Sequence, residues 1–148
     1  MQTLTAAVYI SCCISNTDPT IPLGLEVWID GSLVFDQPSI SDPIQFVHTV
    51  ADDDADHEIR WVMKNKITEH TTIDQQGNIV KDACLVINDL KFDDIDLGHI
   101  FVEKSSYHHD FNGTAAPVEE KFYGNMGCNG SVSLKFTTPI YLWLLENL

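Results

Sequence analysis

Apolar and polar residues alternate along much of this chain, in short stretches separated by Gly, Pro, Asn and Asp. A period of two places the apolar side chains on one face of a β-strand and the polar side chains on the other. In residues 57–64, Ile59, Trp61 and Met63 alternate with residues that are mostly charged. This stretch therefore predicts a strand with one buried face and one face in water.

Turn residues predict two hairpins. Asp30-Gly31 stands between two apolar runs, and both residues tolerate the positive φ angles of a type I′ turn. Residues 25–35 are therefore expected to form a tight hairpin. Residues 71–80 predict a second hairpin, with Gly77 in its turn.

The other alternating stretches complete an all-β pattern. Further strands are predicted over residues 4–15, 44–50, 84–97, 107–111, 121–123 and 131–136. A change of phase near Asn88-Asp89 indicates a bulge or tight bend. The chain has no long helical period and no internal repeat. About eight to ten short strands therefore predict an all-β fold, a jelly-roll-like antiparallel β-sandwich that forms a single domain over residues 1–148.

The C-terminal residues are apolar on every side. Periodicity does not decide whether residues 140–147 form a strand buried on both faces or a short helix packed at an interface. The apolar run is predicted to be a packing or subunit interface. Its residues are Tyr141, Leu142, Trp143, Leu144 and Leu145.

Composition narrows the classes of partner. The chain has 148 residues, 44% of them hydrophobic, and 22 acidic against 8 basic residues give a formal charge of −14. Nucleic acid and anionic membranes are not expected as partners, because both are bound through an excess of Lys and Arg. No apolar run is long enough to span a bilayer, and the start lacks the basic flank of a signal peptide.

Cysteine and histidine spacing argues against a zinc or other transition-metal site. The four cysteines, Cys12, Cys13, Cys84 and Cys128, form no C-x-x-C pair and are expected to be small buried thiols in a reducing compartment. The six histidines show no H-x-H or H-E-x-x-H spacing.

The densest group of carboxylates is a candidate calcium site. Calcium takes six to eight oxygen ligands in flexible geometry. The group consists of Asp52, Asp53, Asp54 and Asp56. It lacks the glycine and the distal glutamate of an EF-hand loop, so a solvated acidic turn between two strands is the other interpretation.

No cofactor is expected otherwise, and catalysis is not predicted. Asp94 and Asp96 would lie about 7 Å apart on one strand face, and could act as an acid and base or bind calcium, but they are also expected on a solvated face. No nucleophile motif or phosphate-binding glycine loop occurs. Trp28, Trp61 and Trp143 could stack on sugar rings, although Trp28 and Trp61 lie in alternating stretches typical of a core.

Several short motifs carry a resemblance to a known group of proteins. They are residues 27–31, 57–60 with the preceding acidic loop, 66–71, 82–87, 92–95, 110–114 and 122–124. Together they resemble small structural proteins of tailed phages of marine bacteria, especially contractile-tailed cyanophages, from about Leu23 to the C-terminus. The order of strands is also similar, more weakly, to calcium-dependent carbohydrate-binding modules. Neither resemblance transfers binding residues to this chain.

The phage resemblance implies a non-catalytic virion structural protein, made in the host cytoplasm. It would be a capsid decoration protein or a component of the neck, tail or fibre, and would assemble with other virion proteins or with itself. The alternative is a carbohydrate-binding β-sandwich that binds a glycan, with calcium bound through the acidic group at residues 52–56.

Overall fold

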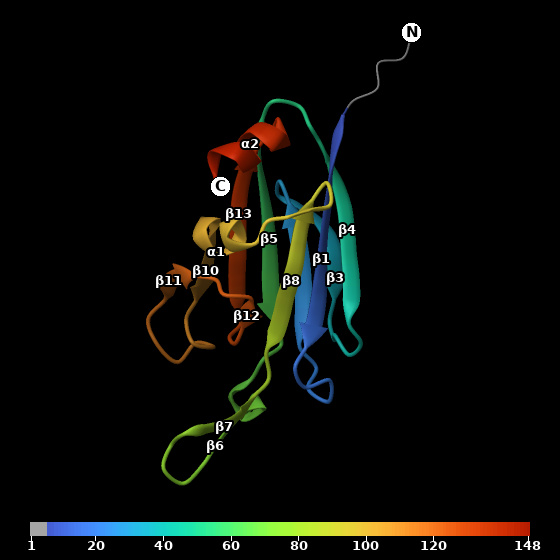
Figure 1. The fold of residues 1–148 in the computed structure, drawn as a ribbon. Coiled ribbons are helices and arrows are strands. Elements are labelled where there is room, and N and C mark those ends of the chain that lie inside the picture. The colour runs from blue at the N-terminus through green and yellow to red at the C-terminus, as the bar shows by residue number, and fades with distance from the viewer. Residues whose placement is uncertain (1–5) are drawn as a thin grey trace.

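The computed structural model describes residues 6–148 as two antiparallel β-sheets packed face to face (Figure 1). Sheet A has the strand order β12-β8-β1-β4, with β9 also paired to β8. Its strands are β1 (Ala7–Asn16), β4 (Ile44–Ala51), β8 (Leu85–Phe92), β9 (Ile95–Asp96) and β12 (Asn125–Met126). The predicted all-β sandwich is thus confirmed.

Sheet B is the wider layer, with six strands in the order β11-β10-β13-β5-β2-β3. Its strands are β2 (Gly24–Ile29), β3 (Ser32–Gln37), β5 (Asp56–Lys64), β10 (Ser105–His109), β11 (Val118–Lys121) and β13 (Gly130–Thr137). The remaining elements are η1 (Thr68–His70), the hairpin β6 (Thr71–Ile73) and β7 (Ile79–Asp82), and the short helices α1 (His99–Lys104) and α2 (Ile140–Glu146). The described residues contain more strands than the eight to ten predicted, because several are only two to four residues long.

Local sequence explains the turns. Asp30 and Gly31 adopt φ angles of 51° and 80°, which confirms the predicted turn between β2 and β3. Gly77, at φ 83°, lies in the turn between β6 and β7. The phase change in β8 is also confirmed, because its register with β1 shifts between Ser11 and Cys13, next to Asp89 at φ 55°.

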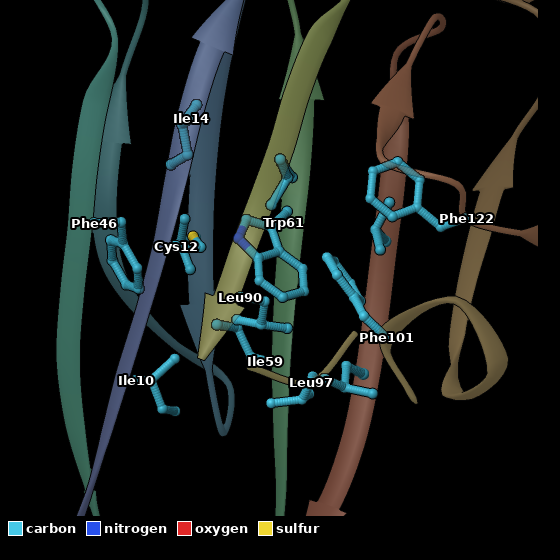
Figure 2. Packing of buried hydrophobic residues seen from close by; sticks show 14 of the residues in the cluster. Ile10, Cys12, Ile14, Phe46, Ile59, Trp61, Leu90, Leu97, Phe101 and Phe122 are labelled. Carbon is cyan, nitrogen blue, oxygen red and sulfur yellow. The ribbon is translucent and has the colours of Figure 1, made fainter. Parts of the chain in front are cut away.

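Alternating residues of the two sheets meet in one core. Trp61 is fully buried at its centre, with its indole nitrogen on the side of Cys12 (Figure 2). The Phe101 ring lies 5.4 Å from that of Trp61 and 5.5 Å from that of Phe122, so α1 closes this side of the core with an aromatic row. Burial raises the pKa of the Cys12 thiol to about 12.

Trp28 is not in the core, contrary to its expected place there. The alternate residues Val27 and Ile29 point inward, so Trp28 lies half-buried on the outer face of sheet B. Its indole N–H donates a hydrogen bond to Glu26 Oε1, 3.0 Å away on the same face. Alternation predicts that β2 has one buried face, but the phase of the strand in the sheet decides which of its large residues face inward.

The C-terminal apolar run is a helix, which settles the choice that periodicity left open. α2 buries Trp143 and Leu144 against the sandwich, with the Trp143 ring 5.9 Å from that of Phe92. Tyr141, Leu142 and Leu145 remain 53%, 54% and 68% exposed. Only these three of the five predicted interface residues are therefore free to contact a partner.

The β6–β7 hairpin projects from the end of the sandwich opposite α2 (Figure 1). Ile73, Ile79 and Val80 on it are at least 60% exposed. No helix among residues 6–148 is long and apolar enough to cross a membrane. All four cysteines are unpaired thiols, of which Cys12 is buried and the others half-buried.

Candidate functional site

His57 stands at the α2 end of the sandwich, at the start of β5. Its ring lies between two carboxylates, with Nδ1 2.6 Å from Asp30 Oδ2 and Nε2 2.8 Å from Asp53 Oδ1. Asp30 comes from the β2–β3 turn, and Asp53 from the loop between β4 and β5. His57 is paired with Phe136 on the neighbouring strand β13, so both side chains lie on the same face of sheet B. Their rings stack with centroids 5.4 Å apart.

This geometry favours a charged imidazole. A ring nitrogen next to a carboxylate oxygen must donate, and only the imidazolium has two donors. Burial alone lowers the pKa of His57, but the hydrogen bonds to Asp30 and Asp53 and the charges of both residues outweigh it and raise the pKa. The same hydrogen bond from His57 lowers the pKa of the Asp53 carboxyl.

Thr138, which follows β13, fixes the loop that carries Asp53. Its hydroxyl oxygen accepts hydrogen bonds from the backbone N–H groups of Asp53 and Ala55, at 3.2 and 3.0 Å. The Thr138 side chain is buried, and its hydroxyl also lies 3.2 Å from Asp53 Oδ1. The position of the carboxylate is thus set by the backbone and by its partners together.

A hollow of about 590 Å³, here named the His57 hollow, opens beside this cluster. Its lining combines charged groups with aromatic rings from the end of the core. Among the lining residues are Asp30, Asp56, His57, Lys135, Phe136 and Trp143. It can offer hydrogen-bond acceptors, an ammonium donor and apolar contact to a small polar ligand.

The predicted calcium ligands lie at the rim of this region but do not converge. Asp53 is bonded to His57, Asp54 and Asp56 are exposed, and Asp52 is half-buried with a buried Oδ1 that has no hydrogen-bond partner. Among residues 6–148 no three His, Cys, Asp or Glu side chains are grouped so that they could hold a metal ion. As arranged, these side chains do not fit a calcium ion, and calcium binding stays a prediction.

The carboxylates considered for catalysis lie elsewhere. Asp94 is in the turn between β8 and β9 at φ 63°, not on a strand, and Asp96 accepts a hydrogen bond from the Gly98 N–H. Ile95, between them, is 42% exposed, so this segment lies at the surface. At the His57 cluster both ring nitrogens already contact carboxylates, so neither is free to take a proton from a substrate.

Sequence reasoning missed the His57 cluster. Asp53 belongs to the acidic group that the sequence indicates, but the sequence marks Asp30 only as a turn residue and gives His57 no metal-binding spacing. The available signal was the β2–β3 hairpin itself: if β2 pairs with β5, its turn lies beside the start of β5. That pairing is a long-range contact, which alternation does not specify.

The fold and this end hollow define an antiparallel β-sandwich with a polar pocket at one end of its core. No protein-family model matches the sequence, and a search of curated proteins finds no match. Among solved structures, the selenomethionine form of vCBM60, from a study of two families of calcium-dependent carbohydrate binding modules linked by circular permutation, matches with a TM-score of 0.54 at 10% identity. The match covers 86% of this chain and 89% of that chain.

A second structure, vCBM60 in complex with galactobiose, matches with a TM-score of 0.49 at 12% identity, over 85% of this chain and 96% of that chain. At such identities the likeness establishes the fold alone. It agrees with the weaker of the two resemblances found in the sequence. Nothing in these comparisons supports a phage structural protein or a place in a virion.

Proposed function

We propose that this chain is a carbohydrate-binding module that binds a glycan at the His57 hollow and does not transform it. Support for the class comes from the sandwich fold, which it shares over most of its length with a module described as carbohydrate-binding. Support for the site comes from this chain's own geometry.

The observation that carries the site is the fixed His57 cluster beside an accessible hollow. Sugars are bound by pre-positioned polar groups next to apolar surface, because ordering those groups only on binding would weaken affinity. Hydrogen bonds and the Thr138 anchor already order Asp30, His57 and Asp53. Asp56 and Lys135 line the hollow from neighbouring strands and can bond to ligand hydroxyls.

Calorimetry with a panel of neutral oligosaccharides tests this proposal. Asp56→Ala removes a lining carboxylate that is exposed, and should weaken binding about tenfold without unfolding the protein. Asp42→Ala is the matched control, because Asp42 is also an exposed aspartate but lies in the loop before β4. Absence of binding across the panel, or equal effects of the two variants, would contradict the proposal.

Calcium is tested separately, through the prediction that Asp52, Asp53, Asp54 and Asp56 are its ligands. If they bind calcium, titration of the wild type gives a saturable heat that the double variant with Asp54→Asn and Asp56→Asn abolishes. Asp42→Asn should leave that heat unchanged. The loop as arranged does not group three ligands. A titration without saturable heat would therefore reject calcium binding, and the glycan proposal would be unaffected.

A second candidate role, self-association, is favoured by the exposed apolar side of α2. Tyr141, Leu142 and Leu145 lie together on a short helix whose other side is buried. Light scattering over a concentration series should detect a dimer that the double variant with Leu142→Glu and Leu145→Glu dissociates. A monomer at every concentration would reject this role.

A further inference from the structure

The His57 hollow continues onto the outer face of sheet B. It shares Glu58 and Lys135 with a second hollow of about 320 Å³, the central hollow. The central hollow shares His108 and Glu119 with a third of about 480 Å³, the Gly130 hollow. The three hollows adjoin one another along β10 and β13 and are together named the groove. The eight residues of β13 span about 24 Å.

Strand register shows that the central hollow faces away from the core. Lys135 is paired with Glu58, and Ser133 with Ser106. These residues alternate along β13 with the buried Val132, Leu134 and Phe136, so they must lie on the opposite, solvent face.

Among the described residues, most polar groups of the central hollow have no protein partner. Besides the four shared residues, its lining consists of Lys104, Ser106 and Ser133, so all seven side chains are polar. Within residues 6–148 none of these side chains forms a hydrogen bond to the protein, and His108 Nε2 and Glu119 Oε1 come only within 3.8 Å. In a chain with 22 acidic and 8 basic residues, Lys104 and Lys135 nevertheless lack a carboxylate within 4 Å among the described residues.

Small residues of β13 keep the groove open. A Cβ on Gly130 would lie 2.2 Å from the backbone oxygen of His108, so the two strands approach too closely there for any side chain. Ser131 and Ser133 follow on the outer face. These two serines, which are smaller than His108 and Glu119, form the low floor of the groove, whereas Gly130 is in phase with the inward-facing Val132.

We propose that this groove binds a linear, uncharged glycan of several sugar units, which runs from the His57 hollow along β13 to the Gly130 hollow. This inference rests on the proposed function and extends it, because it names the length and charge of the ligand and the residues that contact it. The free hydroxyl, ammonium, imidazole and carboxylate groups provide donors and acceptors for sugar hydroxyls.

Charge argues for an uncharged ligand. In the central hollow Lys104 and Lys135 balance Glu58 and Glu119, so no net charge attracts an ionic ligand. The formal charge of −14 repels polyanionic glycans over a longer range. A peptide is disfavoured because the central hollow offers no apolar pocket, and because β13 at its floor is paired on both sides and leaves no strand edge there.

A length series tests the groove. With the neutral oligosaccharide type that binds best, affinity measured by calorimetry should rise about tenfold or more from disaccharide to hexasaccharide, as additional units reach the central hollow. If the disaccharide binds and longer oligosaccharides bind no better, the groove is overturned while the proposed function stands. If no oligosaccharide binds, the proposed function fails and this inference fails with it.

Two matched variants test whether the gain in affinity with oligosaccharide length arises in the central hollow. Ser133→Tyr places a large ring in the central hollow and should abolish the gain in affinity with length. Thr49→Tyr adds the same ring to the exposed face of β4 in sheet A and should leave the gain intact. Loss of the gain in both variants, or in neither, would overturn the assignment to this face.

Binding of acidic oligosaccharides tests whether the ligand is uncharged. A hexasaccharide of uronic acids and a sulfated hexasaccharide should each bind at least tenfold more weakly than the neutral one at low salt. Tighter binding of either acidic oligosaccharide would overturn the uncharged assignment.

Discussion

The His57 cluster and the central hollow are neighbouring polar regions of one sheet, and they use their side chains in opposite ways. At the His57 cluster each ring nitrogen has a carboxylate partner, and Thr138 fixes the Asp53 loop. In the central hollow, which begins at Glu58 next to His57, polar side chains surround an open space and form no hydrogen bonds to one another.

The difference separates polar groups that hold the fold together from polar groups available to a ligand. A charge-assisted hydrogen bond to a buried side chain such as His57 adds stability because it replaces water with a fixed partner. A solvated polar group adds almost none, but it can exchange its water for a ligand hydroxyl at little cost. Substitutions in the His57 cluster should therefore lower stability, whereas substitutions in the central hollow should change affinity with little effect on stability.

The largest expected effect on stability is at Gly130, where β10 and β13 approach each other closely. Gly130→Ala would force a Cβ to within 2.2 Å of the His108 oxygen, so β10 and β13 would have to separate. We expect the free energy of unfolding to fall by about 3 kcal/mol in denaturant titrations. Ser131→Ala, one residue further on, is the control and should change it little. A stable Gly130→Ala variant would show that β10 and β13 can separate at this position without cost.

The next effect is expected at the His57 cluster. His57→Ala removes two charge-assisted hydrogen bonds and the stacking contact with Phe136, but Asp30 and Asp53 can return to water because both are over 40% exposed. We expect a loss of about 2 kcal/mol in the free energy of unfolding. His108→Ala, at an exposed histidine of the groove, should cost far less. Equal losses of stability in the two variants would contradict a larger structural role for the His57 cluster.

The pH dependence of the His57 effect sharpens the same contrast. The folded pKa of His57 lies above its ordinary value of 6.5, so its stabilisation is fully present below that pH and is lost as pH rises through the folded pKa. The lowered pKa of Asp53 works in the other direction, since its contribution is lost as pH falls below its ordinary value of 3.8. The stability difference between wild type and His57→Ala should therefore be largest between these limits. A difference independent of pH from 4 to 9 would contradict an imidazolium at this position.

The smallest expected effects on stability lie in the central hollow. Lys104→Ala and Ser133→Ala should each change the free energy of unfolding by less than about 0.5 kcal/mol, because neither side chain is bonded to the protein. Under the proposed groove, Lys104→Ala should weaken hexasaccharide binding, whereas Lys91→Ala on sheet A should not. A large stability loss in Lys104→Ala would show that its ammonium has a structural partner.

Much of the fold was predictable because local chemistry determines it. Asp30-Gly31 requires positive φ, Ile59, Trp61 and Met63 share one strand face, and the shift in β8 shows as a change of phase. What failed depended on tertiary context. The phase of β2 put Trp28 outside, and the short helices α1 and α2 carry too few turns for a helical period to show against neighbouring strands.

The candidate sites were less predictable for the same reason. Asp53 and His57 are four residues apart, but Asp30 joins them only because β2 pairs with β5. The groove depends on β10 lying between β11 and β13, so that side chains from three separate segments of the sequence surround Ser133. No single stretch of the chain contains enough of either site to be recognised.

The projecting β6–β7 ribbon is an isolated two-stranded element, and such ribbons are only marginally stable in water. Its amide protons should exchange with deuterium long before those of β5 or β13, through openings that leave both sheets intact. A protease should accordingly cut first around Gly77, at the tip of the ribbon. Since this tip lies at the end of the sandwich away from α2, the nicked protein should keep its pocket at His57 and offers a natural place to attach a label or a surface tether.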